Sequence, residues 1–366
     1  MRKNERLNEI GFVRAFAILA VLLVHSTSFV IVELPTESRS YAVYNFLNIF
    51  FKYGTPTFIF LSSFVLFYNY ANREITKKML LNFYKKRFLY IVIPYLLFSV
   101  MYFSLTVHLY YDYTFTEALA IFAQKVLTGK AYTHLYFVFI SIQLYLIFPV
   151  VLYLVKKYKW ISKYAIIIGL VIQWAFVLLN HYYMKIEYKG SISLSYMSYY
   201  FLGIYLGVYF ERYRAFLKSR KKHIFTLLWL VSGFFYVYIN YQTRIGLEVY
   251  DSKLYELLWN AYTYFAALFL FGFAFMIYEK VSERVRRFLL YVGDLSFGVY
   301  LIHPFLLLYY RMIPIAPQGV TYHLYNLGLF LSAFIVSIII VDLITRYFKH
   351  SWLLFGAVRK APPKSK

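Results

Sequence analysis

The sequence contains no cysteine, and only 16 of its 366 residues are acidic. The absence of cysteine excludes disulfide bonds, thiolate metal ligands and a cysteine nucleophile, although it does not identify the cellular compartment. The chain also has no Walker A loop, GxGxxG turn, HExxH pair or protein-kinase signature. Asp294 and Asp342 are the only carboxylates well inside a long apolar run. Proton-coupled transporters usually carry acidic residues in their membrane-embedded core, so the composition argues against that class.

Apolar and aromatic residues dominate what is present, because 61% of the chain is hydrophobic and only 15% is charged. Soluble domains are typically about 45–50% apolar and about 25% charged. This load excludes a disordered chain, a collagen and a coiled coil. The net charge of +23 does not indicate a nucleic-acid partner, since Lys and Arg lie in short clusters between long apolar runs. That distribution is typical of an integral membrane protein surrounded by lipid.

Ten segments are apolar enough to cross the membrane, which takes about 20 residues for about 30 Å of hydrocarbon. We therefore predict an all-α polytopic membrane helix bundle, with one domain over residues 1–348 and a basic tail over residues 349–366. The second segment is long and the sixth is short. The predicted spans are residues 10–32, 44–70, 88–108, 134–155, 164–184, 194–210, 224–241, 256–278, 288–310 and 325–345.

The distribution of basic residues predicts the orientation of these spans. Clusters at residues 85–87, 156–157 and 220–222 all fall on the side of the N-terminus, and the opposite loops carry few Lys or Arg. Such an imbalance marks the cytoplasmic side, so we predict that both termini are cytoplasmic. In the longest outer loop, Thr114 and Glu117 form a capping-box pattern ahead of an amphipathic run. We expect this helix to lie flat at the outer interface.

Two polar residues in the first span lie on one helical face. Arg14 and His25 are eleven residues apart, which is about three turns and about 16 Å along the axis. In the simplest interpretation Arg14 reaches the inner interface and His25 makes a packing hydrogen bond. In the functional interpretation they provide a cation near the cytoplasm and a titratable imidazole in the outer half. The sequence alone does not decide between the structural and the functional interpretation.

Other spans also carry polar residues at depths where charge is costly. Lys52 lies deep in the second span and must be paired or line a wet cavity. In the ninth span, Ser296, Tyr300 and His303 share one stripe. Pro304 follows directly, and a proline at this position leaves a carbonyl without its amide donor and predicts a kink.

Two further sets lie at the ends of spans. Lys86 and Arg87 precede the third span, where they either set topology or hold an anionic cytoplasmic ligand. His134 opens the fourth span at the predicted outer surface, where aromatic neighbours usually serve as interfacial anchors.

Several blocks together resemble a known family. The first span reads Arg14-x-x-Ala17-x-x-x-Val21-x-x-x-His25, and later blocks are PTFIFLSSFVLF, KKRFLYIVIP, HLYFVFISIQLYLIFP, YYFLGIYLG and LSFGVYLIHP. In this order, over about residues 8–348, they resemble the acyltransferase-3 family of integral membrane acyltransferases. The resemblance is strongest to the branch of intercellular adhesin polysaccharide proteins and Gram-positive wall O-acetyltransferases.

This resemblance implies a ten-helix enzyme of the bacterial cytoplasmic membrane. It would move an acyl group, usually acetyl, from cytoplasmic acyl-CoA to a hydroxyl of a cell-envelope polysaccharide or its precursor, with glycan synthases as partners. His25 matches the essential histidine, Arg14 the essential arginine, and Arg87 with Lys86 the basic motif of the third helix. Ser63 replaces the usual glycine, and the basic cluster is Lys-Lys-Arg, so bidentate phosphate binding would depend on Arg87.

A mechanism follows from these matches and the charge map. Arg14, Lys86 and Arg87 would bind the phosphates of acyl-CoA, and His25 would take the proton of the acceptor hydroxyl. Lys52 or Tyr300 would stabilise the oxyanion.

His134 and His303 are assigned to substrate binding, and no metal is needed. Direct transfer is favoured, with transient acylation of His25 as an alternative. Two rival functions stay open: a polysaccharide exporter or flippase without covalent chemistry, and a membrane sensor or scaffold.

Overall fold

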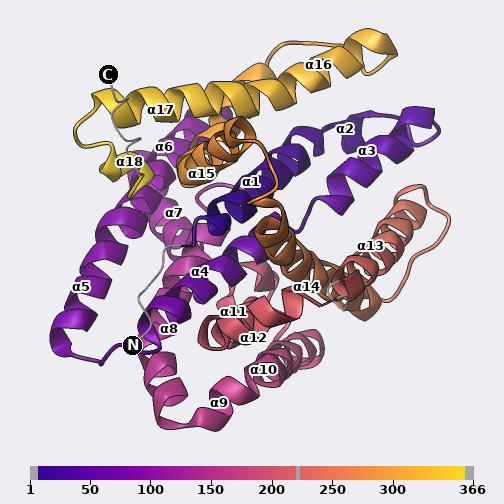
Figure 1. The fold of residues 1–366 in the computed structure, drawn as a ribbon. Helices are drawn as coiled ribbons and strands as arrows, with labels where there is room; N and C mark the ends of the chain where they lie inside the picture. The colour runs from indigo at the N-terminus through magenta and orange to yellow at the C-terminus, as the bar shows by residue number, and fades with distance from the viewer. Residues whose placement is uncertain (1–6, 220–222, 359–366) are drawn as a thin grey trace. The chain divides into compact units, whose positions relative to one another are not determined.

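The computed structural model describes residues 7–219 and 223–358, and every regular element within these ranges is helical (Figure 1). The predicted all-α class is therefore confirmed. The basic cluster predicted at residues 220–222, and residues 359–366 of the predicted tail, lie outside the described residues.

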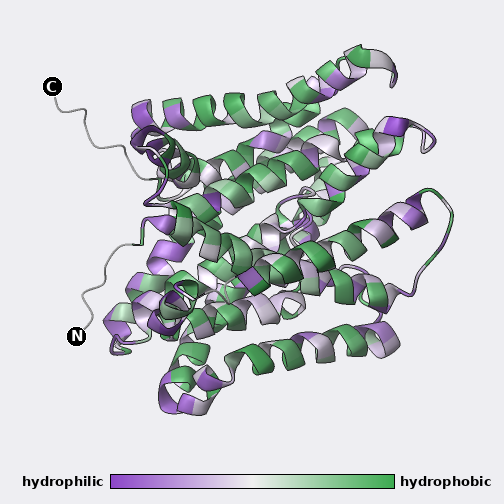
Figure 2. Cartoon of the chain, turned by 45° about the vertical axis from the view of Figure 1, so that its right-hand side comes forward, coloured by the Kyte–Doolittle hydropathy of each residue, from purple (hydrophilic) through white to green (hydrophobic). Residues whose placement is uncertain are grey.

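Nine helical stretches of the described chain are long and apolar enough to span a membrane. In Figure 2 these helices are coloured largely as hydrophobic, with hydrophilic residues mainly towards helix ends and loops. This confirms a multi-pass membrane protein, whereas the orientation of the termini stays a prediction. The nine stretches are Glu9–Glu33, Arg39–Tyr70, Lys77–Tyr110, Tyr136–Lys157, Ala165–Met184, His223–Arg244, Ser252–Ile277, Glu283–Tyr310 and Gly319–Tyr347.

The sixth predicted span is the exception. It forms a 3₁₀ turn, Ser193–Tyr196, followed by α11, Met197–Val208, which has 12 residues. At 1.5 Å per residue this helix is about 18 Å long, too short to cross the hydrocarbon alone. Nearly all of α11 is buried in protein. It packs against α4, where a Cβ on Gly203 would lie 2.5 Å from the Cβ of Ser63. Close packing of the two helices at Ser63 is therefore achieved by a glycine on the facing helix.

Several boundaries differ from the prediction. The first span is α1, Glu9–Thr27, followed by α2, Val30–Glu33, and the second is broken between α3, Arg39–Phe50, and α4, Gly54–Tyr70. The third begins earlier than predicted. Its helix α5, Lys77–Arg87, continues through a π-helical turn, Phe88–Val92, into α6, Ile93–Tyr110. Lys86 and Arg87 therefore lie within a continuous helix rather than before one.

The remaining helices follow the predicted order. The helix predicted after Thr114 is confirmed as α7, Phe115–Leu127, with both hydrogen bonds of the Thr114–Glu117 capping box present, and its place at the outer interface stays a prediction. The others are α8, Tyr136–Lys157; α9, Lys159–Lys163; α10, Ala165–Leu179; α12, Phe210–Leu217; α13, His223–Arg244; α14, Ser252–Ile277; α15, Glu283–Tyr310; α16, Gly319–Leu331; α17, Ser337–Tyr347; and α18, Trp352–Phe355. Two further π-helical turns are Asn180–Met184 and Ser332–Val336.

The chain divides into two compact units, each made of two separate stretches of sequence. The first comprises Met1–Phe58 and Glu211–Asp342, and the second comprises Ile59–Phe210 and Leu343–Lys366. In the first unit α1 and α15 run side by side (Figure 1), and Gly11 and Gly293 bring their backbones into direct contact.

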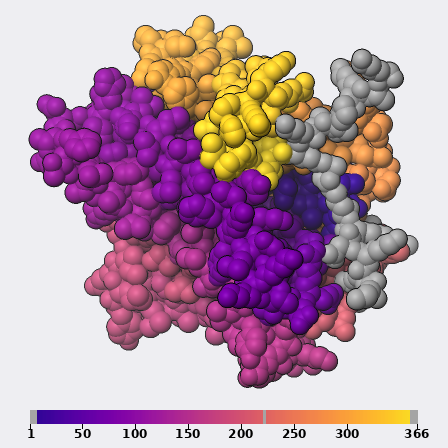
Figure 3. Space-filling view, turned by 90° about the vertical axis from the view of Figure 1, so that its left-hand side faces the viewer, coloured from indigo at the N-terminus to yellow at the C-terminus, as the bar shows by residue number. Residues whose placement is uncertain are grey.

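In the second unit the segment after α17 packs against the helix Lys77–Tyr110. Trp352 contacts Tyr90, and Phe355 contacts Phe98. Figure 3 shows this C-terminal segment in yellow, beside residues drawn in purple. The predicted tail therefore begins with a short docked helix, α18.

Candidate active site

A pair of histidines lies between α1 and α15 in the first unit. The ring centroids of His25 and His303 are 5.2 Å apart, and the rings meet edge to face at 68°. His303 is completely buried, whereas His25 is partly exposed. Neither ring nitrogen of His25 makes a hydrogen bond to any of the described residues. Its imidazole is thus accessible and available to an external ligand.

The sequence around Pro304 fixes the ring of His303. Nδ1 of His303 lies 3.1 Å from the carbonyl oxygen of Val299, and the ring also bonds to the carbonyl of Tyr300. A proline has no amide proton, so Pro304 does not donate to the Tyr300 carbonyl one turn earlier. A carbonyl only accepts, so Nδ1 of His303 carries the proton and Nε2 is left as an acceptor.

The predicted stripe on α15 is confirmed as a buried face. Ser296, Tyr300 and His303 are 4%, 3% and 0% exposed. The Tyr300 and His303 rings are 6.0 Å apart, so Tyr300 lies within the same aromatic and imidazole cluster as His25. The helix continues through Pro304 to Tyr310.

A cation near the pair was missed by the sequence analysis. Arg311, just after α15, donates a hydrogen bond of 2.6 Å from Nη2 to the backbone carbonyl of His25. Its guanidinium also lies 3.9 Å above the ring of Phe29. Arg311 therefore ties the end of α15 to the end of α1 and brings a positive charge close to both imidazoles.

Arg14 lies on α1 with His25, and α1 is continuous from Glu9 to Thr27. The predicted axial separation of about 16 Å therefore applies. Arg14 is half-buried and interacts with other groups of the chain. It lies towards the opposite end of α1 from the histidine pair.

Lys52 lies in the break between α3 and α4, also in the first unit, and is half-buried. Its charge interacts with that of Arg244 at the end of α13. Arg244 in turn binds Asn45 and Asn48 of α3. The sequence analysis identified Lys52 but missed Arg244 and the two asparagines that bind it, although the Asn-x-x-Asn spacing on one helical face was a usable signal.

The basic motif and His134 lie in the second unit. Arg87 is half-buried, with its guanidinium 5.0 Å above the ring of Phe83 and 4.8 Å above that of Tyr145. Lys86 is exposed. His134 is completely buried, edge-on to the rings of Tyr102 and Tyr132. The roles predicted for all three stay predictions.

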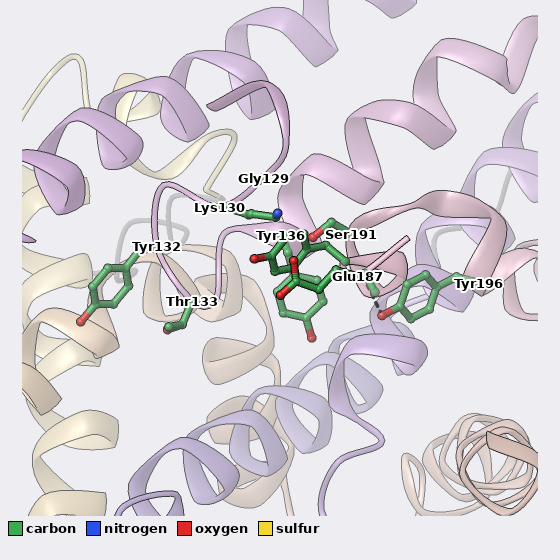
Figure 4. Close-up of a pocket in the computed structure, with 10 residues that line it drawn as sticks. Gly129, Lys130, Tyr132, Thr133, Tyr136, Glu187, Ser191 and Tyr196 are labelled. Carbon is green, nitrogen blue, oxygen red and sulfur yellow. Dashed lines mark hydrogen bonds between the residues drawn. The ribbon is translucent and has the colours of Figure 1, made fainter. Parts of the chain in front are cut away.

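The second unit also contains a pocket of about 530 Å³, and several of its lining residues flank His134 in the sequence. In Figure 4, Lys130, Tyr136 and Glu187 gather around its middle. Lys130 also contacts the ring of Tyr188, and hydrogen bonding to the Glu187 carboxylate raises the pKa of Tyr188. Aromatic walls with a few polar groups are typical of small-molecule sites. The lining residues are Gly129, Lys130, Tyr132, Thr133, Tyr136, Glu187, Tyr188, Gly190, Ser191 and Tyr196.

The fold and the histidine pair together define a multi-pass membrane protein with a partly exposed imidazole beside a buried one. Comparison with known families is more specific, since a family model described as "Acyltransferase domain" matches residues 7–346. The chain therefore belongs to the acyltransferase-3 family, as its motifs predicted.

Curated relatives add a second description. A Staphylococcus epidermidis protein named "Probable poly-beta-1,6-N-acetyl-D-glucosamine export protein" is 26% identical over 320 residues, covering 84% of this chain and 82% of its own. A protein of the same name from Staphylococcus aureus strain MSSA476 is 23% identical over 320 residues, covering 82% of each chain. No solved structure matches the chain.

Proposed function

We propose that this protein transfers an acyl group, in the first instance acetyl, from acyl-CoA to a hydroxyl of a cell-envelope polysaccharide or its precursor, in the bacterial cytoplasmic membrane. Membership of the acyltransferase-3 family supports acyl transfer in general. The observation that carries the chemistry is the His25–His303 pair, in which the accessible imidazole of His25 has no hydrogen-bond partner among the described residues.

In the proposed reaction His25 acts as a general base. One ring nitrogen takes the proton of the acceptor hydroxyl while the hydroxyl oxygen attacks the thioester carbonyl, so that a new C–O bond forms. The C–S bond then breaks, and the CoA sulfur leaves with the proton that His25 had accepted. General-base catalysis of this kind is typically worth about 10²–10⁴-fold. Tyr300, in the same cluster, and Lys52 are proposed to stabilise the negative carbonyl oxygen of the intermediate.

The binding site for the acyl-CoA donor is proposed from the positions of the basic residues. Arg14 would bind a phosphate of acyl-CoA at the end of α1 away from His25, which the predicted orientation assigns to the cytoplasm. The same role is proposed separately for Lys86 and Arg87 of the second unit. A phosphate anion and a guanidinium form strong, charge-assisted hydrogen bonds. Replacing Arg14, Lys86 or Arg87 by a neutral residue is therefore expected to raise the KM for acyl-CoA.

The printed names of the relatives favour a second candidate function, which is export of a polysaccharide without covalent chemistry. The pocket of the second unit suits either function. Sugar rings pack their C–H faces on aromatic rings, and their hydroxyls bind polar groups such as Lys130 and Glu187. The two candidates therefore differ at His25, which only acyl transfer needs as a base.

The test compares cells that produce the wild-type protein, His25→Ala and His181→Ala. His181 is an exposed histidine at the end of α10 and serves as the matched control. Mass spectrometry of envelope glycans should show one acyl group lost with His25→Ala and retained with His181→Ala, while the amount of exported glycan stays the same. Loss of export with unchanged acylation would instead support the export function.

A further inference from the structure

A second polar cluster in the first unit is built around Arg244. Its Nη1 donates a hydrogen bond of 2.8 Å to Oδ1 of Asn45, and its Nη2 donates one of 3.4 Å to Oδ1 of Asn48. Nδ2 of Asn48 donates hydrogen bonds in turn to the carbonyl of Val24, at 3.1 Å, and to Oγ1 of Thr27, at 3.3 Å. The cluster therefore adjoins the end of α1 that carries His25.

The cluster has positive charge but no acidic partner. Arg244 makes no ion pair with any of the described residues, and the titratable groups in its electrostatic range are the phenols of Tyr41 and Tyr236 and the ammonium of Lys52. Lys52 likewise has neither a hydrogen bond nor an ion pair from its ammonium to the described chain. Two half-buried cations are thus close enough to repel each other at membrane depth. Cations in membrane spans normally pair with an anion or face a water-filled cavity.

Asn45 adds an unused donor to the same cluster. Its side chain is 0% exposed, and its Nδ2 has no hydrogen-bond partner among the described residues. Asn45 and Asn48 are one helical turn apart on one face of α3, and Lys52 follows two residues after the end of that helix. Buried amide donors nearly always have a partner. An unpartnered donor beside two unneutralised cations is the arrangement expected of a binding site for an oxyanion.

We propose that Arg244, Lys52 and Asn45 form a binding site for a phosphate-bearing group near the His25 end of α1. A tetrahedral phosphate has enough acceptor oxygens for the amide and both cations, and guanidinium and ammonium are the usual protein ligands of phosphate. The group would belong either to a membrane lipid headgroup or to the acceptor that reaches His25. The acceptor assignment rests on the proposed function, whereas the existence of the anion site does not.

The test measures thermal unfolding of the full chain in phosphatidylcholine nanodiscs, with inorganic pyrophosphate as the probe and chloride at equal ionic strength as the reference. A ligand that binds only the folded state raises the unfolding midpoint. We expect pyrophosphate to raise the midpoint of the wild-type protein. We expect Lys52→Gln to bind pyrophosphate at least tenfold more weakly.

Asn45→Asp is the decisive variant because it supplies an internal carboxylate to Arg244 and Lys52. It should fold, with an unfolding midpoint at or above that of the wild type, and should no longer respond to pyrophosphate. The control is Arg39→Gln, at an exposed position of the same helix. Both substitutions lower the net charge by one unit, so the comparison separates position from overall charge. An equal loss of response in Arg39→Gln would overturn the proposal.

A second arm uses nanodiscs that contain phosphatidylglycerol. If a lipid headgroup fills the site, the wild-type midpoint rises in these nanodiscs and the response to pyrophosphate disappears, while Asn45→Asp is insensitive to the lipid. If the wild type responds to neither pyrophosphate nor phosphatidylglycerol, the site does not exist. Acyl transfer measured in parallel separates the two proposals, since binding without transfer refutes only the enzyme and transfer without binding refutes only this site.

Discussion

The contact between Gly11 and Gly293 gives a direct test of whether the histidine pair requires the spacing of α1 and α15. In Gly293→Ala the new Cβ would lie 2.8 Å from the backbone carbonyl carbon of Gly11, whereas ordinary contacts begin at 3.4 Å. Backbone atoms of a helix cannot rotate away, so the two helices must separate by about half an ångström or more. His25 and His303 lie on these same two helices, about 21 Å along α1 from Gly11, and we expect the displacement of the packed helices to reach them.

The expected loss follows from this displacement. A misplacement of about 1 Å in a catalytic site can lower the rate about 10²-fold, so we expect acyl transfer to fall roughly 10- to 100-fold. Overpacking should also destabilise the protein by about 1–3 kcal/mol. Transfer of radiolabelled acetyl from acetyl-CoA to envelope glycan, normalised to folded protein, measures the first effect, and thermal unfolding measures the second.

The matched control is Gly272→Ala on α14. Its Cβ would meet the Cδ2 of Leu217 at 2.9 Å and the hydroxyl of Tyr213 at 3.0 Å, which are the mobile ends of side chains. This variant is overpacked but leaves α1 and α15 in contact, so it should retain most of the transfer. Wild-type transfer by Gly293→Ala, or an equal loss in Gly272→Ala, would refute the link between helix spacing and catalysis.

Three other predictions concern separate parts of the chain. Arg14→Gln should raise the KM for acyl-CoA and leave kcat less affected, and an unchanged KM in steady-state kinetics would remove Arg14 from the donor site. Tyr188→Ala should weaken binding of envelope oligosaccharides to the aromatic pocket without changing the unfolding midpoint, as measured by calorimetric titration. Hydrogen bonds from Thr114 lower the pKa of Glu117, so its contribution to α7 is present at neutral pH and lost as the pH falls through that lowered pKa. Thr114→Ala should therefore destabilise α7 by about 1 kcal/mol, and amide-exchange protection factors of Phe115–Leu127 should lose this acid dependence.

Local features of the fold were predictable because their signals are local. The Thr114–Glu117 spacing predicted the start of α7, and apolar runs predicted ten spans, of which nine correspond to helical stretches of the described chain that are long enough to cross a membrane. The sixth span was misjudged because apolar residues buried in protein and apolar residues facing lipid look alike in sequence. The start of α5 was misplaced since its exposed basic residues form a helix that extends beyond the apolar run.

The candidate site was predictable only in part. Arg14, His25, Tyr300 and His303 were identified one by one from polarity within apolar runs, but the contact between His25 and His303 joins residues 278 positions apart. Arg244 was not singled out from the sequence, because its partners on α3 are about two hundred residues away in the chain. Pairings of this kind depend on tertiary packing, which periodicity does not encode.

Pro304 has a consequence for how protons travel through the pair. Because Pro304 does not donate to the Tyr300 carbonyl, that carbonyl can accept from the imidazole of His303. The ring proton therefore lies on Nδ1, which donates to main-chain oxygens. Only the opposite nitrogen can then exchange, so His303 has a fixed polarity and cannot pass a proton from one side of its ring to the other. Under the proposed mechanism, a proton taken by His25 is therefore not passed onwards through His303, and His25 itself returns it to the leaving sulfur.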